Sequence, residues 1–209
     1  MSNGPRSFGI DSLTAFDLAW PAAADTLRPN AIAPGLTVPL QSAQGGDYLR
    51  IRGYRRAAMA LSEILKKGDR VDEALAYPFV YCWRHHVELQ IKKFIEDSVA
   101  LHGDLLPEDV HKTHSIGALW NFAEKYIKKS FPKDSSADTT VPGKIIGQLA
   151  QIDPDGMVLR YARTASGQPT LKKAVWVELE PFHTAMLNLS AYFNGTIEGT
   201  SALSDCQPY

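Results

Sequence analysis

The sequence from Pro78 to Leu101 is PFVYCWRHHVELQIKKFIEDSVAL, and its apolar residues recur at spacings of three and four. This spacing places them on one face of an α-helix. Proline is tolerated in the first turn of a helix, so Pro78 suits the start, and Gly103 and Pro107 follow the end. The stretch therefore predicts a long helix over residues 78–101 with one buried stripe. The stripe consists of Val80, Trp83, Val87, Ile91, Phe94 and Ile95.

The same spacing predicts further helices on both sides of this stretch. Asp47 suits the N-cap of the first of them, and Gly195 is expected to stop the last. The connections between the helices are short, which favours antiparallel neighbours. The predicted fold class is therefore mainly α, an up-and-down bundle of four to five helices. The further helices are predicted over residues 47–67, 115–129, 143–151 and 181–193.

The pattern changes before the last predicted helix. Residues 157–161 and 173–179 are short and rich in β-forming side chains, and Gly167 and Pro169 lie between them. Two such runs separated by turn residues are typical of a pair of antiparallel strands. A small β-hairpin is therefore predicted, inserted before the last helix.

The two ends of the chain differ from its helical middle. Residues 1–46 contain five prolines, which remove backbone donors and resist regular structure. They predict an irregular Pro-rich N-terminal arm, whose apolar residues are expected to pack on the domain. Residues 195–209 are small and polar and predict a flexible tail. One helical domain over residues 47–194 remains. The apolar residues of the arm are Phe16, Leu18 and Trp20.

Composition limits the cellular setting and the partners. Over 209 residues, 44% are hydrophobic and 22% charged, values that are ordinary for a globular domain. The net charge of −1 gives no overall field for polyanions, so a nucleic-acid site must be a local basic patch. The only cysteines, Cys82 and Cys206, form neither a disulfide framework nor a zinc motif. No signal peptide and no run near the ~18 apolar residues of a membrane helix is present, so a cytoplasmic location without membrane contact is expected.

Arg84, Glu88 and Lys92 lie at i, i+4 and i+8, so they share one stripe of the predicted helix. Ion pairs on a solvated face would explain the stripe. Alternatively, Arg84 and Lys92 bind phosphate and Glu88 holds them in place. His85 and His86 project about 100° apart, and one of them could act as a general base or acid beside Arg84. The alternative for the two histidines is a place in the core or in an interface.

His111 and His114 precede the helix predicted over 115–129. With His85 or His86 and Glu88 they would form a metal site only if the loop folded back. The simpler interpretation is that His114 caps its helix or hydrogen-bonds to the preceding one. No metal and no other cofactor is predicted.

The helix predicted over 47–67 is the most basic element, and Arg55 and Arg56 belong to its cluster. A solvated face would explain the cluster. The alternative is a footprint for RNA or DNA phosphates, with Tyr54 available for stacking and Arg160 extending the patch.

Three short segments occur in the order and spacing of a known family. WRHHVELQIK, residues 83–92, has a Glu followed four residues later by a Lys, and THSIGALW occupies residues 113–120. LRYA follows at residues 159–162. They resemble the second helix, the Thr-His-Asp-Leu segment and the Arg-Tyr-Pro element of the HEPN (higher eukaryotes and prokaryotes nucleotide-binding) family, with Ala162 in place of the proline. The resemblance covers residues 48–193.

The resemblance implies a helical bundle that often dimerises, so a homodimer is expected. Many members are metal-independent ribonucleases of toxin or phage-defence systems. Those nucleases share an Arg followed, after four to six residues, by a His. None of the six histidines here has an arginine five to seven positions before it. The missing pair favours a non-catalytic member.

Two hypotheses follow. The leading one is a HEPN-like homodimer that binds nucleic acid or nucleotides, RNA above all, and can cleave RNA without a metal. The competing one is a non-catalytic module for dimerisation or partner binding. The leading hypothesis needs one polar, solvent-reachable cleft, whereas the module is expected to pair the same residues internally. The candidate catalytic residues are Arg84, His85, His86 and His114, and the candidate binding residues are Glu88, Lys92, Arg55, Arg56 and Arg160.

Overall fold

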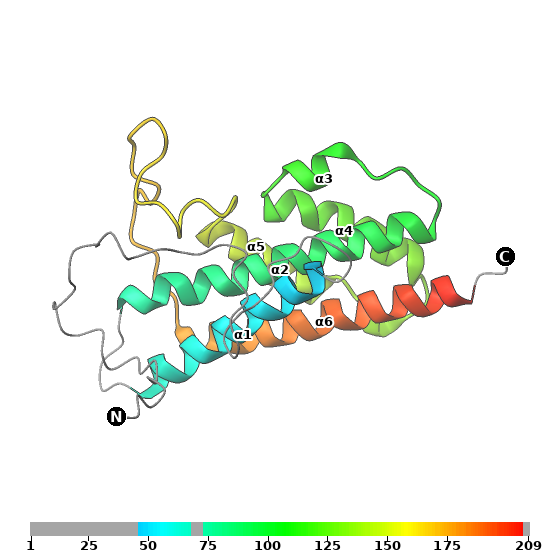
Figure 1. Cartoon of the computed structure of the whole chain (residues 1–209), viewed down its shortest axis with the longest axis horizontal. Coiled ribbons are helices and arrows are strands. Elements are labelled where there is room, and N and C mark those ends of the chain that lie inside the picture. Colours follow the sequence, from blue (N-terminus) through cyan, green and yellow to red (C-terminus); the bar gives the residue numbers. More distant parts are fainter. Residues whose placement is uncertain (1–45, 68–72, 207–209) are drawn as a thin grey trace, which may run out of the picture. The chain divides into compact units, whose positions relative to one another are not determined.

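A computed structural model describes residues 46–67 and 73–206 of the chain. In these ranges the protein is mainly helical, as predicted, and its helices pack together (Figure 1). The predicted arm and its apolar residues lie outside the described residues. The short helices α3 and η2 were not among the predicted elements. The elements are α1 (Gly46–Lys67), α2 (Glu73–Leu101), α3 (Glu108–Lys112), α4 (Ile116–Ser130), the 3₁₀ turn η2 (Ser135–Ala137), α5 (Thr140–Ile152) and α6 (Leu179–Asp205).

Helix α2 is the centre of the bundle and packs against α1, α4 and α6 (Figure 1). The predicted stripe is buried, and Trp83, Val87 and Ile91 are 0% exposed. α2 begins at Glu73, so Pro78 lies inside the helix and not in its first turn. Buried apolar residues from α1 to α6 form a single cluster, which is the core of the described residues. Among the described helices, none combines the length and the apolar character needed to cross a membrane.

Helix α6 corrects the predicted end of the domain. It does not stop at Gly195 but continues to Asp205, so the predicted end of the last helix is wrong. Its inner face continues beyond the glycine, because Thr196 and Thr200 are buried. Glycine weakens a helix by only about 1 kcal/mol, which packing of this kind can offset.

The predicted β-hairpin is also wrong. Within the described residues, the segment between α5 and α6 contains no strand and has a single β-bridge, Arg163 to Pro169. Residues 157–161 instead form a turn, in which the Tyr161 amide donates to the Met157 carbonyl at 3.0 Å. Local hydrogen bonds of this kind compete with the hydrogen bonds between paired strands. Residues 157–161 are therefore not free to pair with residues 173–179.

Candidate functional site

Arg84 is fully buried, and each of its side-chain nitrogens has a partner inside the protein. Nε donates to the Asp153 carbonyl at 3.1 Å, and Nη1 is paired with the Glu88 carboxylate. Nη2 donates to the carbonyls of His114 at 2.6 Å and of Pro154 at 3.3 Å. Arg84 therefore joins three segments of the chain, and its guanidinium does not face solvent.

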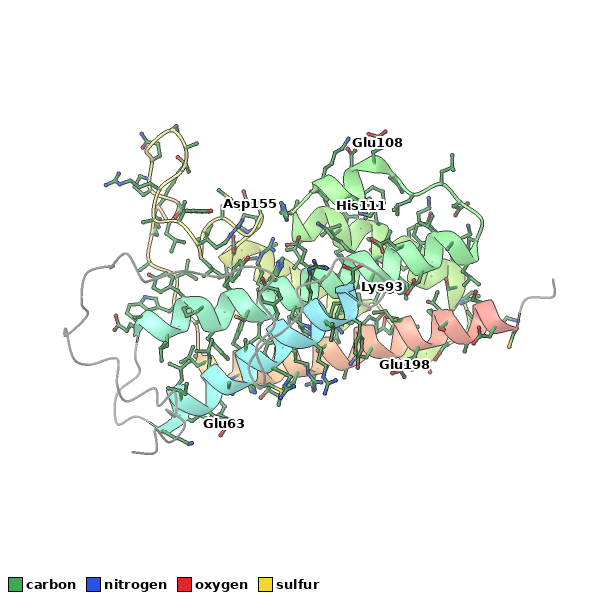
Figure 2. The ribbon with its side chains drawn as sticks, viewed as in Figure 1. Glu63, Lys93, Glu108, His111, Asp155 and Glu198 are labelled. Carbon is green, nitrogen blue, oxygen red and sulfur yellow. The ribbon has the colours of Figure 1, made fainter. Side chains whose placement is uncertain are left out.

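The turn after α5 is built around this guanidinium. Asp153 is buried, its Oδ2 lies 3.6 Å from Arg84 Nε, and its Oδ1 accepts from the Val158 amide at 3.1 Å. Gly156 has φ +77°, and a Cβ there would lie 3.2 Å from Arg84 Nη1. Glycine suits this position both for its backbone conformation and for the close approach. Figure 2 marks this turn by Asp155 and marks α3, which precedes the His114 segment, by His111.

Glu88 is a buried carboxylate surrounded by basic side chains. Its Oε1 lies 2.8 Å from His114 Nδ1 and 3.1 Å from Lys92 Nζ. Its Oε2 is paired with Arg84 and lies 3.8 Å from His85 Nδ1. Burial by itself would raise the pKa of this carboxyl, but the His85 and His114 imidazoles and the Arg84 charge together hold the pKa well below its usual range. Glu88 is therefore an ionised centre that orients its neighbours.

His114 and His85 keep contact with solvent, because 55% and 21% of their side chains are exposed. The Nδ1 of His114 faces Glu88, so a neutral ring donates from Nδ1 and leaves Nε2 as the basic nitrogen. Ser115, and not His114, caps α4 by accepting from the Ala118 amide at 3.3 Å. Of the two roles predicted for His114, the structure shows the hydrogen bond to the long helix, here between His114 and Glu88 of α2.

His86 faces the opposite side of α2 and is buried. Its Nδ1 lies 2.8 Å from the Ile51 carbonyl oxygen, and its Nε2 lies 2.8 Å from the Ser190 hydroxyl. Burial lowers its pKa to about 4, with a further contribution from the Arg55 charge, while the hydrogen bond to Ile51 opposes the shift. A neutral ring that donates from Nδ1 and accepts at Nε2 satisfies both partners. His86 is thus a core histidine that links α1, α2 and α6.

A series of ring contacts extends from His85 in both directions and forms an aromatic ladder. Tyr54 of α1 meets the His85 ring edge-on at a centroid distance of 4.4 Å, and Tyr81 stacks on it at 5.6 Å. The Arg160 guanidinium lies over the Tyr81 ring at 5.6 Å and over the Tyr161 ring at 5.4 Å. All five members, Tyr54, Tyr81, His85, Arg160 and Tyr161, are at least partly exposed.

The basic residues of α1 are divided by the fold. Tyr54 lies on the side of His85, whereas Arg55 influences His86 on the other side of α2. Within the described residues, the Nε of Arg55 is buried without a hydrogen-bond partner. Arg56 is exposed. A phosphate footprint shared by Arg55, Arg56 and Arg160 stays a prediction.

The metal alternative requires three converging ligands. His111 Nδ1 lies 3.6 Å from Glu96, and its side chain is 59% exposed, so it is not part of the Glu88 cluster. In residues 46–67 and 73–206, no group of three or more histidine, cysteine, aspartate or glutamate side chains is placed to hold a metal ion.

Sequence reasoning missed Tyr81 and Asp153. Tyr81 lies three residues before Arg84 and could have been found by continuing the stripe of Arg84, Glu88 and Lys92 toward the N-terminus. Asp153 carries no such local signal, because it meets Arg84 only through the tertiary fold.

The chain was compared with models of protein families, with characterised proteins and with solved structures, and none of them matches it.

Proposed function

We propose that this chain is a HEPN-like protein that binds single-stranded RNA or nucleotides on the aromatic ladder. The ladder is the observation that supports the proposal, because unpaired bases stack on aromatic rings and on arginine planes. His114 lies next to the ladder, because Glu88 contacts both His114 and the ladder member His85. The resemblance of residues 83–92 and 113–120 to HEPN segments favours the same assignment and a homodimer.

Stacking is expected to contribute more than phosphate contacts. The chain has a net charge of −1, so it has no overall field that attracts polyanions. A protein that neutralises few phosphates loses little affinity when salt is raised. Binding is therefore expected to depend only weakly on salt.

Cleavage of RNA, if it accompanies binding, would use His114 as the general base or acid. Glu88 orients His114 through Oε1 and lies near His85 through Oε2. Arg84 and His86 are buried and internally paired, so they support the bundle and would not touch substrate. Their pairing also favours the competing function, a non-catalytic module for dimerisation or partner binding.

Fluorescence anisotropy of a labelled single-stranded RNA in EDTA tests the proposal. Replacing one stacking side chain, Tyr161→Ala, is expected to weaken binding about tenfold. Arg56→Ala is the matched control and should leave the affinity unchanged. Equal affinity of wild type and Tyr161→Ala for the RNA would contradict binding on the aromatic ladder.

The same RNA, followed on a gel, separates the two candidate functions. Cleavage by wild type that His114→Ala loses, while it still binds, would assign a ribonuclease that uses His114. Binding without cleavage by wild type would keep the proposed RNA-binding function without a ribonuclease activity, and no binding would favour the module for dimerisation or partner binding.

A further inference from the structure

A cavity of ≈ 530 Å³ lies between the start of α2, the end of α5 and the segment before α6. This volume falls in the range of small-molecule sites, which are lined mostly by apolar side chains and by few polar ones. Most of its walls are aliphatic. They include Val80, Ile152, Val158, Leu159, Leu171 and Leu179.

A second cavity of ≈ 330 Å³ adjoins the first, because Tyr77, Val158, Leu159 and Leu171 line both. The smaller chamber is the more polar one, since Arg160 and Thr170 line it and do not line the larger chamber. The two chambers together therefore offer an apolar space with the Arg160 guanidinium at one end.

The larger chamber leaves two aromatic rings open to water. Trp176 is 93% exposed and Tyr77 is 52% exposed, and both line it. Aromatic side chains bury large apolar areas when they gain a partner, so a ligand that covers these rings is stabilised by their burial.

Arg160 is not neutralised at the smaller chamber. Its Nε donates to the Gly156 carbonyl at 2.6 Å, and its Nη2 has a weak acceptor, the Met157 sulfur, at 3.4 Å. In the described ranges, no carboxylate lies within ion-pair distance of Arg160. A guanidinium in this state can bind a carboxylate or phosphate through two parallel hydrogen bonds.

We propose that the two chambers form one binding site for a small amphipathic anion. Its apolar body would fill the larger chamber against Trp176 and Tyr77, and its carboxylate or phosphate would bind Arg160. Glu73 lines only the larger chamber, so repulsion there disfavours the reversed orientation. The proposal goes beyond RNA binding: it shares Arg160 and Tyr161 with the aromatic ladder but requires no nucleic acid.

Two dyes of nearly the same shape test the site on the full chain. Anilinonaphthalene sulfonate carries a negative charge, and phenylnaphthylamine is its uncharged counterpart. Both are expected to bind saturably, one per chain, with increased fluorescence. Arg160→Gln should weaken the sulfonate about tenfold and leave the neutral dye unchanged, since a hydrogen-bonded charge contributes about that factor.

Arg163→Gln is the matched control, because Arg163 donates to the Gly167 carbonyl at 2.9 Å and lines neither chamber. It should bind both dyes as wild type does. Leu159 lines both chambers, so Leu159→Trp puts a larger side chain into them and should abolish binding of both dyes, while circular dichroism shows the helices retained. If that variant does not fold, the Arg160→Gln comparison still decides, because Arg160 is exposed.

Competition distinguishes the source of the anionic group. Displacement of the sulfonate dye by decanoate assigns a carboxylate on an acyl chain, and displacement by adenosine monophosphate assigns a nucleotide phosphate. The proposal is overturned if neither dye binds saturably, or if Arg160→Gln binds the sulfonate as tightly as wild type. It is also overturned if the variant weakens both dyes equally. None of these outcomes involves RNA, so they leave the function proposed for the ladder standing.

Discussion

Neighbouring polar residues of α2 differ in role because they face different parts of the fold. Arg84 and Glu88 face the turn after α5 and the segment before α4, and backbone carbonyls of both accept hydrogen bonds from Arg84. His86 faces α1 and α6. Buried charges and buried polar groups are costly unless they are paired, so each of these side chains is held by specific partners. His85 lies between the two faces and keeps a solvent-exposed edge.

Removing the guanidinium of Arg84 should destabilise the protein strongly. Arg84→Ala leaves Glu88 and Asp153 buried with fewer partners, and breaking a buried ion pair in this way costs about 3–5 kcal/mol. Urea unfolding at neutral pH measures the loss. Arg56→Ala, on the exposed face of α1, should change the free energy of unfolding by less than about 0.5 kcal/mol. Equal stability of the two variants would contradict an internal role for Arg84.

His86 should make stability depend on pH. Its pKa falls from 6.5 to about 4 on folding. Between these values the unfolded chain binds a proton that the folded chain does not, so the free energy of unfolding decreases as the pH falls. The contribution is constant above pH 6.5 and is lost progressively toward pH 4.

Urea midpoints from pH 7.5 to 4 would measure this dependence. His86→Gln should remove the component, and His111→Gln, at an exposed side chain, should keep it. The same slope in wild type and His86→Gln would show that another group is responsible.

At the scale of elements, the long helices α2, α4 and α6 were predicted as helices, but α2 begins earlier and α6 ends later than predicted, and short or irregular segments were predicted poorly. α2, α4 and α6 each carry an apolar stripe that fixes both the helix and its buried face. The segment between α5 and α6 has β-forming residues, but its local turn hydrogen bonds and its contacts with the bundle decide its path. β-propensity describes how side chains fit a pleated surface, and no neighbouring strand is available to this segment in the described part of the chain.

The two glycines of α6 provide a matched test of its packing. A Cβ at Gly195 would have no atom within 4 Å, whereas a Cβ at Gly199 would lie 3.0 Å from a ring carbon of Phe131. Gly195→Ala should therefore stabilise the protein by about 0.5–1 kcal/mol, the usual gain of alanine over glycine in a helix. Gly199→Ala should gain less or destabilise, because Phe131 must move. Thermal unfolding compares them, and an equal gain from both would contradict the packing of Phe131 on Gly199.

At the scale of the whole molecule, the buried apolar core found among the described residues is made by helical residues. The cluster that runs from Ala58 to Phe193 draws residues from α1 to α6. A chain reduced to residues 46–209 is therefore expected to unfold in one cooperative transition. The slope of its unfolding free energy against urea concentration should be that of a single domain of this length. Circular dichroism at increasing urea measures this. A broad, non-cooperative transition would mean that residues before Gly46 are needed to cover the core.

The amino-acid sequence was enough to predict the helical class, the face that α2 buries and the shared stripe of Arg84, Glu88 and Lys92. Those features follow from spacing along one helix, which is a local property. It could not decide whether the stripe was exposed or buried, because the covering residues, Asp153 and Gly156, lie far away in the chain. The tertiary structure decided that Arg84 and His86 are internal and that His85 and His114 keep an exposed edge. The physical reason is burial: the same imidazole or guanidinium is a reactive group at the surface and a hydrogen-bonded support in the core.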